Sequence, residues 1–119
     1  MKREILFRGK RVDNGEYIQG DLTRLITPRK TALFINGIEV IPETIGQFTG
    51  LTDKNGVNIF EGDILDAKSD IVVVRYEKIY ASFGIWKKGW AFLHYFHEAV
   101  EPNDCIIVGN IHDNPELLA

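Results

Sequence analysis

The sequence predicts a mostly β fold, arranged as a sandwich or a small barrel, with one or two short helical turns. Runs of β-branched and aromatic residues recur at a spacing of roughly 8–12 residues, which is typical of such folds. Turn-forming residues separate these runs, and three Asn-Gly pairs stand out at Asn14-Gly15, Asn36-Gly37 and Asn55-Gly56. Asparagine and glycine both tolerate the positive φ that tight hairpin turns need, so each pair predicts a turn between two strands.

The three Asn-Gly pairs organise the first half of the chain. The strand pairs expected around them are 5–8 with 17–19, 33–35 with 38–41, and 47–49 with 57–60. The hairpin around Asn36-Gly37 is the clearest, because apolar strand residues lie directly on both sides of the pair. At the third turn we expect Gly56, together with Asn55, to adopt positive φ.

The second half continues in the same way. Its predicted strands are 63–66, 71–76, 82–86, 90–94 and 105–108. The turn Lys87-Lys88-Gly89 makes a hairpin of the third and fourth of these. Helical turns are expected at 42–45 and 114–118, and residues 94–100 are a further candidate for a short helix. The signal at 114–118 is the best of them, because Asn114 is a good N-cap and Pro115 suits the first helical position.

Composition places the chain among ordered globular proteins. Of its 119 residues, 45% are hydrophobic and 26% are charged, which excludes wholesale disorder. No apolar run approaches the ~18 residues of a membrane span, and no secretory signal is recognised at the start. The single Cys105 excludes an internal disulfide framework and a cysteine-based zinc cluster. We therefore expect a cytoplasmic protein that does not bind membranes.

Charge is distributed unevenly along the chain. The net charge of -3 argues against a dedicated nucleic-acid binder. Residues 1–30, however, hold eight basic and four acidic side chains, whereas residues 61–119 hold five basic and ten acidic ones. This asymmetry indicates either attraction within one fold or an electrostatic binding patch. The candidate binding residues are basic side chains near the start and aromatic and basic side chains around one turn: Arg3, Arg8, Lys10, Arg11, Trp86, Lys87, Lys88 and Trp90.

No catalytic, metal or cofactor site is predicted. The chain has no nucleophile-elbow, phosphate-loop or dinucleotide-binding motif. Cys105 precedes an apolar run, so we expect a buried, inert thiol. The alternative is a small metal-dependent hydrolase that uses His94, His97 and Asp63. A helix would place the two histidines on one face, whereas a strand would place them on opposite faces. The carboxylates Asp63, Asp66 and Asp70 are better explained by turn chemistry and solubility.

The stretch from Ile41 to Gly56, continuing from Ile59 to Ile64, resembles the YopX family of bacteriophage and prophage proteins. Further matches are the opening 3–10, the landmark 20–22 and the closing motif 107–118. The resemblance implies a β-rich N-terminal lobe over residues 1–60 and a small SH3-like barrel over residues 61–119, within one family unit. It carries no catalytic residues. Its characteristic positions are turn and bulge formers: Gly46, Gly50, Asn55, Gly56, Gly62, Gly109 and Asn110.

The function expected from these observations is binding rather than catalysis. The chain is expected to be a phage or prophage accessory protein in the cytoplasm of its bacterial host. Its partner is expected to be a host or phage protein, or nucleic acid through the basic N-terminal region. Self-association is a further expectation, because Leu117 and Leu118 either fold back onto the barrel or pack on another subunit.

Overall fold

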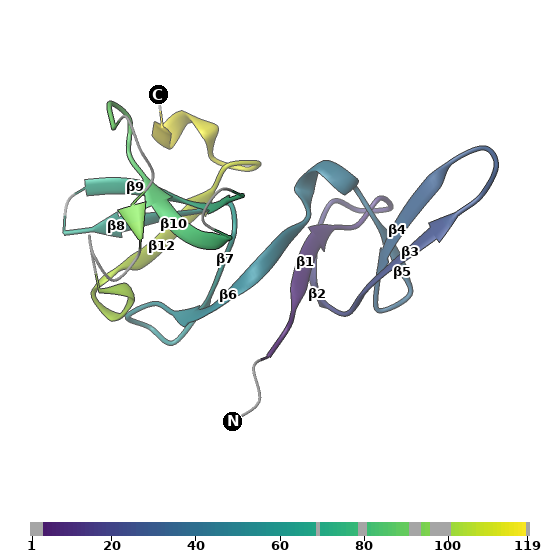
Figure 1. Ribbon diagram of the computed structural model, residues 1–119, viewed down its shortest axis with the longest axis horizontal. Helices are drawn as coiled ribbons and strands as arrows, with labels where there is room; N and C mark the ends of the chain where they lie inside the picture. Colours follow the sequence, from purple (N-terminus) through teal and green to yellow (C-terminus); the bar gives the residue numbers. More distant parts are fainter. Residues whose placement is uncertain (1–3, 69, 79–80, 91–93, 96–100, 119) are drawn as a thin grey trace. The chain divides into compact units, whose positions relative to one another are not determined.

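The computed structural model describes residues 4–68, 70–78, 81–90, 94–95 and 101–118 (Figure 1). The fold is mostly β, as the sequence predicts, and its helices are three short 3-10 turns among these residues. The chain divides into two compact units, Met1–Phe48 and Thr49–Ala119. This division lies earlier in the chain than the one expected after residue 60, because the strand 58–60 belongs to the second unit.

The first unit opens with an antiparallel hairpin of β1 (Phe7–Lys10) and β2 (Tyr17–Gly20), in which Lys10 lies opposite Tyr17. The predicted turn joins them: Gly15 has a φ of 74°, and the Asn14 side chain accepts a hydrogen bond from the Glu16 backbone at 2.9 Å. The long strand β6 (Gly46–Thr52) pairs with β1 at its start and with β7 at its end. The first predicted hairpin is thus confirmed.

A second, three-stranded sheet in this unit contains β3 (Leu22–Ile26), β4 (Thr31–Ile35) and β5 (Ile38–Val40) in that order. Asn36 and Gly37 form the β4–β5 turn with φ values of 51° and 80°, so the clearest predicted hairpin is confirmed. The Asn36 side chain also bonds to the backbone of Gln19 and Asp21, and this fixes the bend between β2 and β3. The 3-10 turn η1 (Pro42–Thr44) follows, as predicted.

The second unit is built on a five-stranded antiparallel sheet in the order β11-β10-β9-β8-β12. Its elements are β7 (Asn58–Phe60), β8 (Asp63–Ala67), β9 (Asp70–Glu77), β10 (Ser82–Trp86), β11 (His94–Tyr95), η2 (Pro102–Asp104), β12 (Ile106–Asn110) and η3 (Pro115–Leu118). Strands β8, β9, β10 and β12 match the strands predicted at 63–66, 71–76, 82–86 and 105–108. The core of this unit contains Ile59, Leu65, Val72, Val74, Ile85 and Cys105.

Two predicted elements of the second unit need correction. The strand expected at 90–94 does not begin at Trp90, which ends a turn with its N–H bonded to the Lys87 carbonyl, and β11 comprises His94–Tyr95. The helix suggested at 94–100 is wrong at its start, since these two residues pair with Gly84 and Ile85 of β10. Pairing with a neighbouring strand supplies backbone hydrogen bonds that local sequence does not reveal. Residues 91–93 and 96–100 lie outside the described residues.

Among the residues that the structure describes, no helix is long and apolar enough to cross a membrane. Cys105 is fully buried in the core, and burial raises the pKa of its thiol. A raised pKa keeps the thiol protonated, and a protonated thiol is a poor nucleophile. These features agree with the inert role predicted for Cys105.

Candidate functional site

Asp53, in the stretch that resembles the YopX family, organises the β6–β7 turn. Its carboxylate is buried, and Oδ1 accepts hydrogen bonds from the backbone N–H groups of Asn55 at 2.8 Å and Val57 at 2.9 Å. Oδ2 accepts a third from the N–H of Ile107 at 3.2 Å, which ties the turn to β12. Burial by itself raises the pKa of Asp53, but the three N–H donors outweigh it and hold the pKa below its usual value.

The β6–β7 turn has the conformation predicted at Gly56 but not at Asn55. Gly56 has a φ of 78°, and its N–H donates to the Asp53 carbonyl at 3.0 Å. Asn55 is not among the residues with positive φ, so that part of the prediction is wrong. The bond from Gly56 to Asp53 is that of an ordinary β-turn followed by a left-handed glycine, which needs positive φ at only one position.

The closing motif is held by its own side chains in the same manner. Oδ1 of Asn110 accepts hydrogen bonds from the N–H groups of His112 and Asp113, each at 3.0 Å. Oδ1 of Asn114 accepts one from the N–H of Asn110 at 3.2 Å. A side chain at Gly109 would begin 2.5 Å from this Asn114 oxygen, so only glycine fits there. These residues build a loop; their polar atoms are used within the fold.

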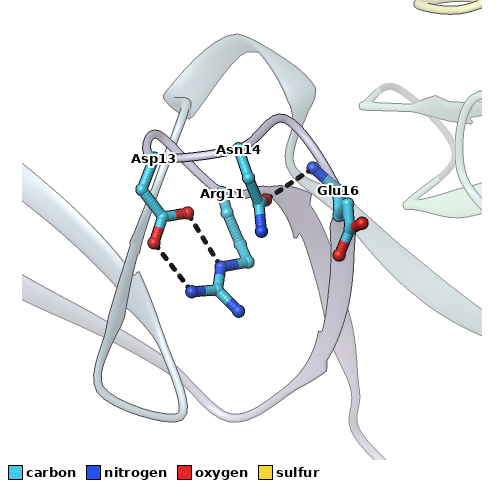
Figure 2. A network of polar contacts seen from close by, with 4 residues as sticks. All are labelled: Arg11, Asp13, Asn14 and Glu16. Carbon is cyan, nitrogen blue, oxygen red and sulfur yellow. Dashed lines mark hydrogen bonds and ion pairs between the residues drawn. The ribbon is translucent and has the colours of Figure 1, made fainter.

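The basic candidates near the start of the chain differ in their availability. The Arg8 guanidinium and the Lys10 ammonium lie 5.0 Å and 5.5 Å from the centre of the Tyr17 ring, so two cations share one aromatic ring. Arg11 is paired with Asp13 through two hydrogen bonds of 2.9 Å and 2.7 Å (Figure 2). These bonds raise the pKa of Arg11 and lower that of Asp13, and the pair carries no net charge. Arg3 lies outside the described residues.

The candidates around the Trp86–Trp90 turn lie in the second unit and are largely committed to it. Trp86 is half-buried, donates its Nε1 hydrogen to the Trp90 carbonyl at 3.1 Å, and stacks under the Arg75 guanidinium at 4.4 Å. Lys87 pairs with Asp70 at 2.7 Å. Trp90 is also half-buried and packs against the core. Lys88 alone of these four is exposed.

The structure adds a surface that the selection of site residues from sequence missed: the hairpin of β3 and β4. Residues 23–31 are all exposed, and its loop end points away from β1 and β2 of the same unit (Figure 1). Leu25 and Ile26 are 53% and 65% exposed. A sequence signal was present, because residues 22–38 contain Arg24, Arg29 and Lys30 but no acidic residue.

Of the three residues proposed for a hydrolase, His94, His97 and Asp63, the structure describes the side chain of Asp63 alone. Asp63 is buried, and its Oδ2 accepts a hydrogen bond from the Phe60 N–H at 2.8 Å. His97 lies outside the described residues, and of His94 only the strand position is described. Within the described ranges, no three histidine, cysteine or acidic side chains are grouped so as to hold a metal ion.

Comparison with known proteins identifies the family. The model of the family described as YopX protein matches residues 6–119. The fold is similar to the crystal structure of protein EF1440 from Enterococcus faecalis, with a TM-score of 0.61 and 24% sequence identity over 99% of this chain and 100% of that chain. No curated protein matches. Since the match spans nearly the whole chain, this protein belongs to the YopX family.

Proposed function

We propose that this chain is a non-enzymatic accessory protein of a phage or prophage, and that it acts in the bacterial cytoplasm by binding a macromolecular partner. Membership of the YopX family supports the phage context. In the second unit, β12 lies beside β8, β9 and β10 follow in turn, and η2 precedes β12. This connectivity supports an SH3-type barrel, a scaffold that suits binding rather than any particular chemistry.

The β3–β4 hairpin is the observation that carries the proposal. Leu25 and Ile26 leave more than half of their surfaces in water, next to the cations of Arg24 and Arg29. Because successive residues of a strand point to opposite faces, Leu25 and Ile26 leave apolar surface exposed on both faces of the hairpin, and exposed apolar surface beside charged side chains is typical of interaction sites. β3 is also an edge strand of its sheet, so one side of its backbone has no neighbouring strand in the order β3-β4-β5.

The test is the loss of a partner when the hairpin loses its apolar side chains. The wild-type chain and the variant Leu25→Ser/Ile26→Ser would be used to capture proteins and nucleic acids from a lysate of Enterococcus faecalis, the source of the similar structure. The matched control is Val12→Ser/Val57→Ser, which changes two apolar side chains of similar exposure, 55% and 52%, outside the hairpin. Thermal denaturation would establish that all three chains are folded.

We expect the wild type and the control to retain the same partner and the hairpin variant to lose it. Capture of the same partner by all three chains would contradict the proposal, because the hairpin would then have no part in binding.

A further inference from the structure

We infer that the β3–β4 hairpin binds the phosphate backbone of double-stranded DNA. The inference rests on the proposed function and names the partner of the same surface. It depends on three properties of the hairpin: the charge of its side chains, the shape of a two-stranded ribbon and the fixed geometry of its loop. Together they match a polyanion with a groove that admits such a ribbon.

The hairpin carries a positive charge, and no acidic residue within it neutralises that charge. Residues 22–38 contain three basic side chains and no acidic one. Arg24 and Arg29 are exposed and form no hydrogen bond or ion pair with the described residues. The Lys30 ammonium makes one contact with the described residues, at 3.4 Å to Glu39, and the side chain keeps 65% of its surface exposed. An exposed pair of this length contributes little stability, so a phosphate competes with it easily.

The shape of the hairpin suits a DNA groove. β3 and β4 pair in register up to Ile26 opposite Thr31, so only the loop 27–30 lies beyond the paired ribbon. The major groove of B-DNA admits a two-stranded antiparallel ribbon, and phosphates on both sides of the groove accept hydrogen bonds from arginine, lysine and threonine. The exposed Ile26, which shares a face of β3 with Arg24, then meets sugar carbons and thymine methyl groups, which are the apolar parts of a groove.

The loop is fixed before any partner arrives. The Thr27 N–H donates to the Lys30 carbonyl at 2.9 Å, and the Thr27 hydroxyl donates to the same carbonyl at 2.8 Å. In return, the Lys30 N–H donates to the Thr27 hydroxyl at 3.1 Å. Pro28 further restricts the backbone beside Arg29. A loop held in this way loses less conformational entropy on binding, so Arg29 is presented to a phosphate at a low entropic cost.

The charge also decides against the most obvious protein occupant of an edge strand, a second hairpin. Two copies that met along β3 would bring together two segments that each carry Arg24, Arg29 and Lys30 and no carboxylate. Repulsion between like charges disfavours such a contact. A polyanion gains from all three cations at once and releases its bound counterions on contact.

The experiment measures how DNA binding depends on salt. The full chain would be titrated into a fluorescein-labelled duplex of about 24 base pairs at about 50 and about 200 mM salt, with fluorescence anisotropy as the readout. Three phosphate contacts predict a slope of about -2.7 in a plot of log affinity against log salt, or roughly a 40-fold loss of affinity between the two conditions. The variant Arg24→Gln/Arg29→Gln should bind more weakly, with a slope reduced to about -0.9.

The control is Lys54→Gln/Lys78→Gln, which removes the same charge from two exposed positions of the second unit. Its affinity and slope should match those of the wild type. The inference is overturned if the wild type does not bind the duplex, or if the two double variants behave alike.

Two further outcomes separate this inference from the proposed function. If the hairpin retains a nuclease-resistant protein partner through Leu25 and Ile26 but does not bind the duplex, the DNA inference falls and the proposed function stands. If light scattering shows an oligomer that Arg24→Gln/Arg29→Gln disrupts, without duplex binding by the wild type, the hairpin joins copies of the chain and the inference is likewise overturned.

Discussion

Removal of the Asp53 carboxylate should destabilise the second unit more than removal of any exposed carboxylate. Asp53→Ala takes away the acceptor of three backbone N–H groups, those of Asn55, Val57 and Ile107. Water replaces the carboxylate at Asn55 and Val57, which are exposed, but reaches the half-buried Ile107 less readily. Since hydrogen bonds to a charged acceptor contribute about 1.5–3 kcal/mol each and are not additive, we expect a loss of about 3 kcal/mol in the free energy of unfolding.

Asp53→Asn should cost about 2 kcal/mol, because one oxygen remains for the turn while the new amide group opposes the Ile107 N–H. Urea denaturation followed by tryptophan fluorescence suits the measurement, since Trp86 and Trp90 both lie in the second unit. Asp104→Asn, at an exposed position of the same unit, is the control and should change the free energy of unfolding by less than about 0.5 kcal/mol. Equal urea midpoints for Asp53→Ala and the control would refute the assigned role.

The stability of the wild type should also depend on pH through Asp53. Its pKa is lower in the folded chain than the ordinary 3.8, so the folded state favours the ionised carboxylate. The stabilisation is complete above the unfolded pKa and is lost as the pH falls through the folded pKa. Between about pH 5 and about pH 2, the wild type should therefore lose more stability than Asp53→Asn does. Parallel pH profiles of the two chains would contradict this reasoning.

Three other predictions concern the turns and the end of the chain. Gly56→Val should lower the free energy of unfolding by more than about 1 kcal/mol, because residue 56 has a φ of 78°. Backbone strain alone is responsible, since a side chain there would meet nothing within 4 Å. Urea denaturation measures the loss, and an unchanged midpoint would contradict the prediction. Gly109→Ala should lower the free energy of unfolding, because the Asn114 side-chain oxygen lies 2.5 Å from the position of the new carbon. The double variant Gly109→Ala/Asn114→Ala should then lose less free energy of unfolding than the two single variants together. Additive losses would count against the contact. A chain that ends at Asn114 should unfold at a lower urea concentration, because it lacks η3, which lies against β9 of its own chain. Light scattering should show the same oligomeric state for this chain and the full chain. An oligomer lost on truncation would show that Leu117 and Leu118 join subunits.

The strand order along the chain and several turns follow from the sequence by itself. Asn36-Gly37 and Gly56 adopt positive φ as predicted, because that conformation is a property of one or two residues and hardly depends on the rest of the fold. The β-branched run that became β9 is equally local, since its side chains favour extended backbone. The resemblance to the YopX family could be recognised from the sequence because its characteristic residues form turns, which are also local structures.

Tertiary structure decided which side chains are available to a partner. The sequence predicted Arg11 and Trp86 as candidate binding residues, yet Asp13 pairs with Arg11 and Arg75 covers the Trp86 ring. Asp53 accepts a hydrogen bond from Ile107, which lies 54 positions further along the chain, and only the fold brings these two residues together. Such contacts depend on where distant strands meet. Leu25 and Ile26 are likewise exposed because no other element packs over them in the described structure. The alternation of apolar residues along a strand does not show which face of the strand will be covered.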